Sequence, residues 1–295
     1  MRPKILILGH TGKVGTAVRA ALGPKYHVLG ANSAILDAND LAMVAAMVAG
    51  TKPDVVVNCI AHLGEDACER EPDRAFRLNT LLPRMLADAS EQHKFRLVHF
   101  SSDSVFSGRK RDFLGESDQP DPVNIYGLTK YMADVAIQSG CERHFVFRIS
   151  VQFGESEGKP QFLEKMMAKV RGGEPRLRVA DDIVISPTYS ADVASVVRAA
   201  IEGDIAYGLY HVVDTGSASL YELVCAAFEM LGWRAEIEAA SHVDFPTKAR
   251  KHPITPLRQE KLAPLRDWRD ALAEYCGRVE VHNAASRPRP GPSPR

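Results

Sequence analysis

Paired cysteines, an excess of one charge and long apolar runs are all missing from this chain of 295 residues. The five cysteines are scattered, without a Cys-x-x-Cys or paired histidine motif, which predicts a reducing compartment and no metal site. Lys plus Arg and Asp plus Glu number 37 each, so no basic field points to nucleic acid or membrane. No apolar run reaches the roughly 18 residues that span a bilayer, and a signal-peptide pattern is missing. We therefore expect a cytoplasmic enzyme or binding protein.

A glycine-rich loop follows the first apolar run, Lys4 to Leu8, which is typical of a strand buried on both faces. A helix is expected from Thr16 to Leu22. In such a loop one glycine makes the turn, another admits a pyrophosphate to backbone N–H groups, and a third lets helix pack on strand. The helix N-terminus adds partial positive charge for phosphates. We therefore predict a dinucleotide site, whose loop residues are Gly9, Thr11, Gly12, Lys13, Val14 and Gly15.

The kind of dinucleotide is suggested by the second expected strand, Tyr26 to Gly30. It ends without the acidic residue that usually binds the ribose hydroxyls of NAD. Lys13 could meet a 2′-phosphate, although an ordinary solvated charge is an equal interpretation. The sequence thus favours NADPH, with NADH as the alternative cofactor.

Apolar runs and helical segments alternate up to about residue 150, which predicts an α/β fold with a doubly wound parallel sheet. We assign 1–150 to a Rossmann dinucleotide-binding domain, to which 185–214 returns. Residues 151–184 and 215–281 are expected to form a smaller C-terminal α/β lobe that binds substrate. The tail, 282–295, is rich in Pro, Arg and Ser and is predicted to be disordered.

Tyr126 and Lys130 are spaced to share one face of a predicted helix. A neighbouring ammonium favours the phenolate, so we expect Lys130 to lower the pKa of Tyr126 and make it an acid–base group. Ser102 ends an expected strand 24 residues earlier, where a hydroxyl can hold a carbonyl oxygen. His62 follows the third strand, and we expect it to pack against cofactor or backbone rather than act as a base. The charged segment 64–72 is interpreted as a solvated helix start or subunit contact.

These segments together resemble the dTDP-4-dehydrorhamnose reductase family of extended short-chain dehydrogenases, over roughly residues 3 to 276. Two blocks are specific to this branch, namely Ser102-Asp103 with Val105-Phe106 and Ser186-Pro187-Thr188. The resemblance implies a reductase of a nucleotide-linked 4-keto-deoxysugar, with the sugar nucleotide as its small-molecule partner and a homodimer as an option. The other matching segments are Gly9 to Gly15, Pro53 to Asn58, Ile60 to His62, Asp66, Glu69, Asn79, Tyr126-Gly127, Lys130, Arg148 to Ser150, Tyr189, Asp192, Trp268-Arg269 and Ala271-Leu272.

The resemblance also implies roles for single residues. Ser102 would donate to the substrate C4 oxygen, Tyr126 would protonate it as hydride arrives, and Lys130 would bind the nicotinamide ribose. Asp103 and Val151 fall on the substrate side. The implied cofactor contacts, besides Tyr126 and Lys130, are Gly12, Lys13, Val14, Asp37, Ile60, Ala61 and His62.

The chain departs from the family pattern at three positions. Ser104 and Val151 stand where the family usually has Tyr and Trp on its substrate side, and Ala67 stands where it often has Lys. The loss of both aromatic residues suggests a different sugar, a different nucleotide, or no turnover of a sugar nucleotide. An epimerase and a non-catalytic NADP-binding subunit, like the methionine adenosyltransferase beta subunit, remain alternatives. A dehydratase is disfavoured because its Asp-Glu pair is replaced by Asp103-Ser104.

Overall fold

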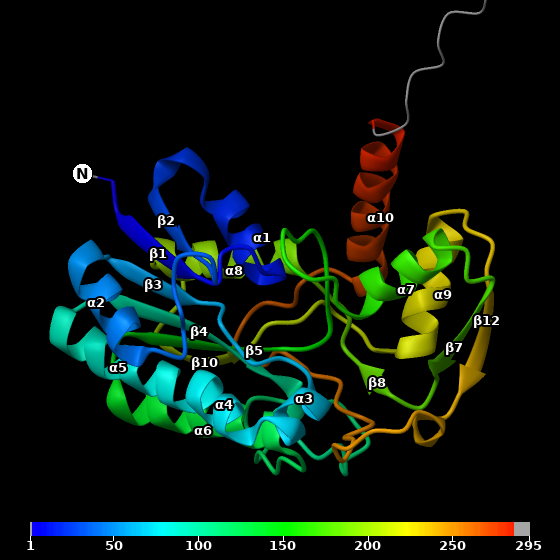
Figure 1. Ribbon diagram of the computed structural model, residues 1–295, viewed down its shortest axis with the longest axis horizontal. Coiled ribbons are helices and arrows are strands. Elements are labelled where there is room, and N and C mark those ends of the chain that lie inside the picture. Colours follow the sequence, from blue (N-terminus) through cyan, green and yellow to red (C-terminus); the bar gives the residue numbers. More distant parts are fainter. Residues whose placement is uncertain (1, 286–295) are drawn as a thin grey trace, which may run out of the picture.

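A six-stranded parallel sheet forms the centre of the computed structural model, which describes residues 2–285 (Figure 1). Its spatial order is β10-β5-β4-β3-β1-β2, and each neighbouring pair is parallel. The order reverses between β1 and β3, where doubly wound folds open a crevice for ligands. The strands are β1 (Lys4–Leu8), β2 (His27–Ala31), β3 (Val55–Asn58), β4 (Arg96–Ser102), β5 (His144–Ile149) and β10 (Gly208–His211).

Alternate residues of each strand enter opposite cores, as the two-residue period of a strand requires. Ile5 and Ile7 pack with α1 and α8 on one face, while Leu6 and Leu8 pack with α2, α5 and α6 on the other. Because helices cover both faces of the sheet, the strand sequences are continuous apolar runs. These helices are α1 (Lys13–Leu22), α2 (Leu41–Thr51), α5 (Leu82–His93), α6 (Ile125–Gly140) and α8 (Ser190–Glu202).

A second set of elements surrounds its own hydrophobic cluster beside the sheet, to the right in Figure 1. Phe153, Tyr189 and Trp268 are at its centre, and the rings of Phe153 and Tyr189 stack. We call this part the lobe. Its elements are β6 (Gln152–Phe153), α7 (Phe162–Arg171), β7 (Arg176–Ala180), β8 (Val184–Ile185), β9 (Thr188–Tyr189), β11 (Ala218–Ser219), α9 (Leu220–Met230), β12 (Glu236–Ala240) and α10 (Trp268–Ala285).

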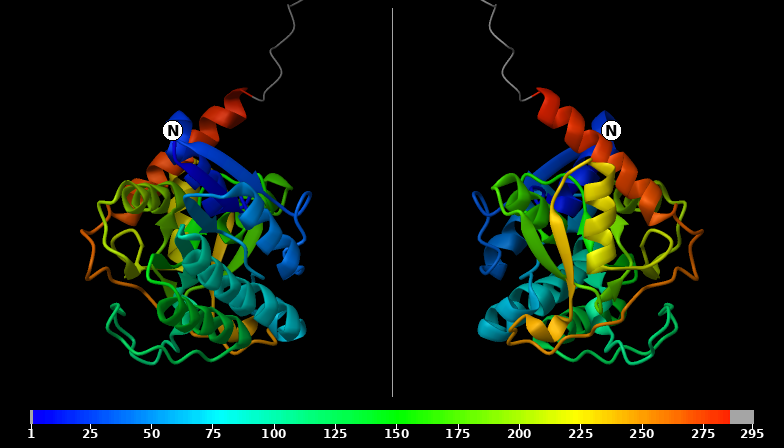
Figure 2. Two further views of the ribbon diagram at one scale, coloured as in Figure 1. Left: turned by 90° about the vertical axis from the view of Figure 1, so that its left-hand side faces the viewer. Right: turned by 90° about the vertical axis from the view of Figure 1, so that its right-hand side faces the viewer.

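Between lobe elements, the chain returns to the sheet, where β10 pairs with β5 and α8 packs on α1. The parallel pair of β12 with β7 closes the far side of the lobe, and sequence analysis did not predict β12. Helix α10 leads away from the body (Figure 2) and reaches Ala285, four residues into the predicted tail. Residues 286–295 lie outside the described residues.

Several short helical elements lie between β3 and α5 along the chain. The helical segment 77–93 begins as a π-helix and becomes α-helical at Leu82, with Pro83 in the first turn of the α-helical part. The remaining short elements are η1 (Gly23–Lys25), α3 (Glu65–Arg70), α4 (Pro72–Phe76), η2 (Arg77–Leu81), η3 (Asp103–Val105) and η4 (His242–Asp244).

Candidate active site

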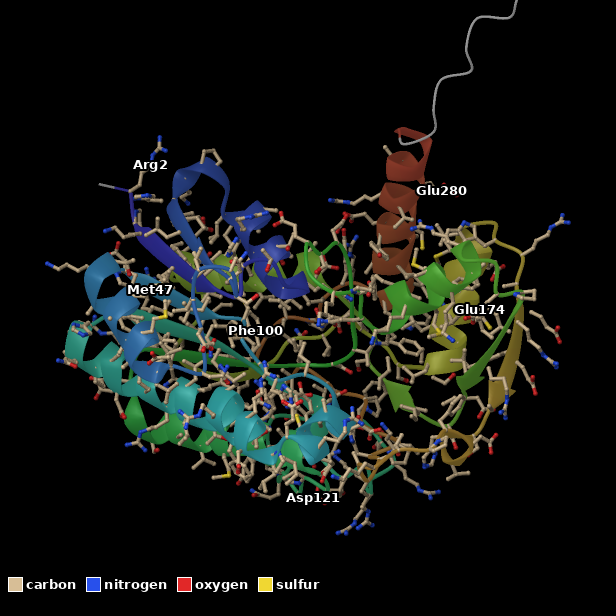
Figure 3. The ribbon with its side chains drawn as sticks, in the orientation of Figure 1. Arg2, Met47, Phe100, Asp121, Glu174 and Glu280 are labelled. Atoms are coloured by element: carbon tan, nitrogen blue, oxygen red, sulfur yellow. The ribbon has the colours of Figure 1, made fainter. Side chains whose placement is uncertain are left out.

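A cavity of about 300 Å³ opens at the carboxyl ends of the strands, between the sheet and the lobe. Figure 3 places Phe100, one of its lining residues, in the middle of the molecule. A larger space of about 630 Å³ lies at the opposite edge, where Lys52, Lys94 and Arg143 precede strands, and it contains none of the predicted site residues. The smaller cavity is lined by eleven of them, namely Gly12, Lys13, Val14, Gly15, Ile60, Ala61, Ser102, Asp103, Tyr126, Lys130 and Val151.

The glycine loop forms one wall of the cavity, and its glycines leave part of its backbone accessible. Gly9 turns with φ of +80°, a conformation that glycine adopts at little cost. A Cβ on Gly15 would come within 2.4 Å of the Gly9 carbonyl oxygen, so only glycine lets α1 start this close to β1. The helix begins at Lys13, three residues before the predicted start. Its free N–H groups therefore face the cavity, which fits a pyrophosphate.

The Lys13 ammonium is held by groups of the lobe in this structure. Its side chain is 3% exposed, and Nζ donates to the Gln152 carbonyl and the Glu164 carboxylate, both at 2.7 Å. Burial lowers the pKa of Lys13, while the Glu164 charge opposes this effect. The solvated-charge interpretation is therefore wrong, and an ammonium held by the lobe is not free for a phosphate.

Four predicted cofactor residues do not line the cavity. Gly9 contributes the turn at the start of the loop. The Thr11 carbonyl accepts a hydrogen bond from Ser156 Oγ at 3.3 Å. Asp37 is exposed, and hydrogen bonds from Asn39 hold the pKa of its carboxyl below the usual value. His62 is fixed through its backbone, since its N–H donates to Asn79 Oδ1 at 2.8 Å and its carbonyl accepts from Asn79 Nδ2. Asn79 thereby orders the loop that carries Ile60 and Ala61.

Ser102 and Tyr126 come together from different elements. Ser102 is the last residue of β4, and Tyr126 lies in the first turn of α6, which Asn124 caps by accepting from Gly127 N at 2.8 Å. Burial raises the pKa of Tyr126 well above its usual value, and hydrogen bonding with Ser102 only partly offsets this. The expectation of a lowered pKa is wrong here, because burial penalises the phenolate. The phenol is protonated at neutral pH.

Lys130 is buried one turn further along α6, at 2% exposure. Its Nζ donates to the Phe100 carbonyl and lies 3.3 Å from His99 Nε2. Burial lowers the pKa of Lys130 to about 8, and the charge of Asp134 partly opposes that shift. These contacts explain why Lys130 does not lower the pKa of the phenol: its nitrogen is directed to β4.

Asp103, predicted to bind substrate, is already engaged within the protein. Its Oδ1 accepts from Ser102 Oγ at 3.0 Å and its Oδ2 from Ser150 Oγ at 2.6 Å, and burial raises its pKa. It therefore orients the Ser102 hydroxyl. Ser104 Oγ lies 3.1 Å from Ser102 Oγ, as an alternative acceptor for the same hydroxyl hydrogen, and also lines the cavity. Ser104 and Val151, two residues that depart from the family pattern, thus stand in its wall.

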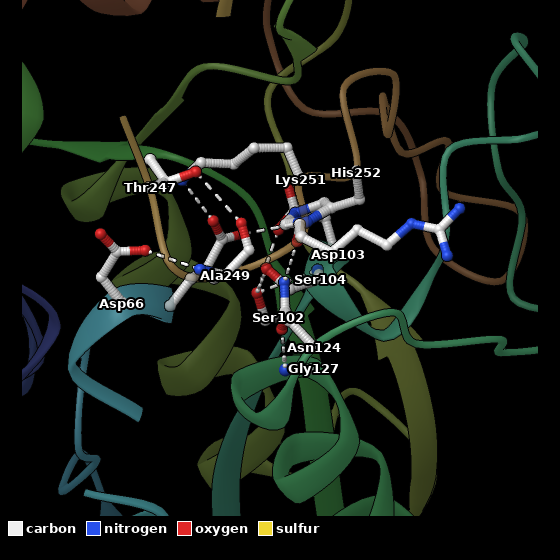
Figure 4. Close-up of polar contacts among 12 residues, drawn as sticks. Asp66, Ser102, Asp103, Ser104, Asn124, Gly127, Thr247, Ala249, Lys251 and His252 are labelled. Carbon is white, nitrogen blue, oxygen red and sulfur yellow. Dashed lines mark hydrogen bonds and ion pairs between the residues drawn. The ribbon is translucent and has the colours of Figure 1, made fainter. Parts of the chain in front are cut away.

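A segment that sequence reasoning missed, 247–252, lies against this site. Figure 4 shows Lys251 and His252 beside Asp103 and Ser104. Glu65 pairs with Lys251 Nζ at 2.6 Å and with His252 Nδ1 at 2.9 Å. The Arg250 carbonyl accepts from the Asn124 side chain at 3.0 Å. No sequence signal marked this segment, because its partners are about 130 to 190 residues away along the chain.

The acidic segment 64–72 therefore has an internal use. Asp66 Oδ1 accepts from the N–H groups of Lys248 and Ala249, each at 3.0 Å, and Glu69 Oε1 accepts from Ile125 N at 2.9 Å. The expectation of a solvated helix start holds only in part, since these carboxylates join α3 to α6 and to 247–252. Within residues 2–285 no group of three or more acidic, Cys or His side chains is arranged to hold a metal ion.

The sheet order, the glycine loop and the Ser102–Tyr126–Lys130 cluster define a short-chain dehydrogenase/reductase of the extended type. A family model described as "RmlD substrate binding domain" matches residues 2–281. The chain belongs to this family, which confirms the predicted fold class and the resemblance stated from the sequence.

Individual relatives agree with this assignment. The chain is 32% identical over 287 residues to a dTDP-4-dehydrorhamnose reductase of Mycolicibacterium smegmatis, covering 95% of this chain and 86% of the relative. It is 29% identical to the enzyme of that name from Escherichia coli K12, covering 90% and 94%. A Bacillus anthracis dTDP-4-dehydrorhamnose reductase, solved in complex with NADP, superimposes with a TM-score of 0.88 at 26% identity, covering 95% and 100%.

Proposed function

We propose that this protein is an NADPH-dependent reductase of a nucleotide-linked 4-keto-deoxysugar. The observation that carries the proposal is the meeting of Ser102, Tyr126 and Lys130 with the glycine loop in one cavity. The loop fits a dinucleotide, since its glycines allow close approach to the backbone and the N-terminus of α1 faces the cavity. The similarity to enzymes named dTDP-4-dehydrorhamnose reductase, one of them in complex with NADP, supports the same reaction and cofactor.

Each of the three side chains has a chemical task in this reaction. Bound NADPH would supply the hydride for the ketone carbon. Ser102 would donate a hydrogen bond to the ketone oxygen, and for this its single hydroxyl hydrogen would turn from Asp103 Oδ1 and Ser104 Oγ, the acceptors near it in the structure. Tyr126, which keeps its proton at neutral pH, transfers that proton to the same oxygen as the alcohol forms. Lys130 lies one helical turn away and would hold the nicotinamide ribose.

The test is oxidation of NADPH, followed by absorbance, across a set of nucleotide-linked 4-keto-deoxysugars. Tyr126→Phe should lower kcat by about 10²- to 10⁴-fold, because it removes only the proton donor. Its affinity for NADPH, measured by calorimetry, should stay nearly unchanged. Ser102→Ala should cost about 10²- to 10³-fold in kcat, as the loss of one donor to a developing oxyanion does. Wild-type turnover in Tyr126→Phe would contradict the mechanism.

Retention of all three residues favours an enzyme over a non-catalytic NADP-binding subunit, and the similarity to enzymes named as reductases favours a reductase over an epimerase. Failure of the wild type to bind either dinucleotide would instead favour the subunit. NADH is proposed as a weaker alternative to NADPH. We also propose that the protein is cytoplasmic and forms a homodimer. We further propose that the chain divides into two domains and that Asp37 and His62 contact the cofactor. Among the described residues, no helix has both the length and the apolar character that a membrane crossing needs.

A further inference from the structure

The side chain of His10, in the glycine loop, lies against Gly30 near the end of β2. A Cβ on Gly30 would come within 2.5 Å of His10 Cγ, 2.7 Å of its Nδ1 and 2.8 Å of its Cδ2. The inner half of the imidazole therefore fills the space that a side chain at position 30 would need. The backbone holds the loop to this strand, since Gly9 N donates to the Ala31 carbonyl at 2.7 Å.

The end of the second strand is where doubly wound folds distinguish NAD from NADP. A dinucleotide with its nicotinamide beside Tyr126 and its pyrophosphate at the glycine loop extends its adenosine ribose toward β2. NAD enzymes place an acidic side chain here, whose carboxylate accepts from the ribose hydroxyls and repels a 2′-phosphate. In this chain the first acidic residue after β2 is Asp37, and an imidazole fills the space above Gly30.

The hydrogen-bonding groups of the His10 ring favour an acceptor as its ligand. Its Nδ1 is buried and has no hydrogen-bond partner among residues 2–285. A buried N–H without an acceptor is costly, so a neutral ring carries its proton on Nε2. Nε2 lies at the opposite end of the ring from Cγ and is left to donate to a ligand. A phosphate oxygen is the stronger acceptor, because a charged partner makes a hydrogen bond roughly twice as strong.

The other ionisable side chains of the glycine loop and α1 are engaged by the lobe. Lys13 is held by Glu164, and Arg19 forms an ion pair with Glu157. His10 is the remaining ionisable side chain of this segment, and within the described part of the chain it forms no ion pair. It is therefore the one that can respond to an additional phosphate on the ribose.

We propose that His10 is a specificity-determining residue that donates a hydrogen bond from Nε2 to the 2′-phosphate of NADPH. Two features then act together at the end of β2. Gly30 provides no carboxylate to repel the phosphate, and the imidazole that occupies its free space provides a donor. The inference rests on the proposed function for the presence of a dinucleotide site. It concerns binding alone, so it holds whichever sugar nucleotide is reduced.

Calorimetry of the full chain with two adenosine fragments tests the contact. Adenosine 2′,5′-bisphosphate and adenosine 5′-monophosphate differ only in the 2′-phosphate. We expect the wild type to prefer the bisphosphate, and His10→Ala to reduce that preference by about tenfold. His10→Gln keeps an N–H donor on a side chain of similar reach and should reduce it by less than about threefold. His27→Ala, at the other end of β2, is the control and should leave it unchanged.

The outcomes separate this inference from the proposed function. A preference that is unchanged in His10→Ala overturns the role of His10 and leaves the reductase function in place. An equal loss of affinity for both fragments also overturns it, because the ring would then only shape the loop. Failure of the wild type to bind NADPH and NADH overturns the proposed function and this inference with it. None of these readouts needs turnover.

A double variant, His10→Ala with Gly30→Asp, tests the position from the other side. Removing the ring makes room for a carboxylate, and Gly30 is not among the glycines with positive φ, so its backbone accepts aspartate. We expect the double variant to bind NADH more tightly than NADPH in calorimetric titrations. A preference for NADPH that survives in the double variant overturns the assignment, since it would place the ribose away from His10 and Gly30.

Discussion

Lys13 Nζ and Glu164 Oε2 lie 2.7 Å apart, joining the glycine loop to the first turn of α7 in the lobe. Glu164 also closes a capping box at the start of α7, where it accepts from Gln161 N at 3.2 Å. A single carboxylate therefore links the predicted cofactor loop to the part of the chain that is expected to bind substrate.

This ion pair predicts how the protein treats its two candidate cofactors. Because the Lys13 ammonium is held by Glu164 and the Gln152 carbonyl, Lys13→Met should change the affinities for NADPH and NADH by similar factors. Calorimetric titration of both dinucleotides checks this, with Arg19→Met as a control on the same helix. A loss of more than about tenfold for NADPH alone would show that Lys13 does contact the 2′-phosphate.

The same pair predicts a stability effect. Glu164→Ala should lower the free energy of unfolding by about 2 kcal/mol, because it leaves a buried ammonium without its carboxylate. The value is below that for a fully buried pair, since Glu164 retains 16% exposure. Lys13→Met combined with Glu164→Leu should recover much of the loss. Urea denaturation of Glu164→Ala, of Lys13→Met, of Glu164→Leu and of the double variant measures these changes. A double variant whose loss of unfolding free energy exceeds the sum of the losses in Lys13→Met and Glu164→Leu would contradict the explanation.

Glu65 and His252 predict a window of pH in which the site is most stable. Burial by itself would raise the pKa of Glu65, but His252 and Lys251 lower it to about 2. Burial by itself would lower the pKa of His252, but the Glu65 carboxylate raises it. The Glu65 contribution is present above its unfolded pKa near 4.5 and is lost as pH falls through the folded value. The His252 contribution is present below its unfolded pKa near 6.5 and is lost as pH rises through its raised folded value.

His252→Gln should therefore be most destabilising between about pH 4.5 and 6.5, on the order of 2 kcal/mol, and much less so at pH 9. Urea denaturation of wild type and variant at pH 5.5 and pH 9 gives the comparison. His93→Gln, a change on the opposite edge of the sheet, is the control. An equal difference at both pH values would mean that the imidazole acts through packing and not through its charge.

Val151 lines the cavity, and we expect its side chain to affect which sugar nucleotide binds. Val151→Trp should raise KM for the preferred sugar nucleotide about tenfold, because the indole would occupy part of a cavity of about 300 Å³. Val151→Ile, which adds a single methylene, should change KM little. Both variants should keep the wild-type affinity for NADPH. An unchanged KM in Val151→Trp would place the sugar away from this wall.

Much of the site could be foreseen because its chemistry sits in short local patterns. Strand β1, the glycine loop and the cap of α2 at Asp40 follow from runs of a few residues, and the predicted Lys4–Leu8 strand is confirmed residue for residue. Ser102 ends β4, and α6 follows β4 in the chain, so Tyr126 in the first turn of α6 lies near the same edge of the sheet. Local pattern and chain order were enough to bring the predicted triad to one cavity.

Contacts between segments far apart in the chain could not be foreseen in this way. Lys13 meets Glu164, Glu65 meets Lys251 and His252, and Asn58 meets His99, through packing that no spacing rule encodes. The same holds for protonation. The residue types name Tyr126 and Lys130 as acid–base groups, whereas burial and the direction of each hydrogen bond set the charge they carry. Desolvation is a property of the folded surroundings, so only the tertiary structure decided it.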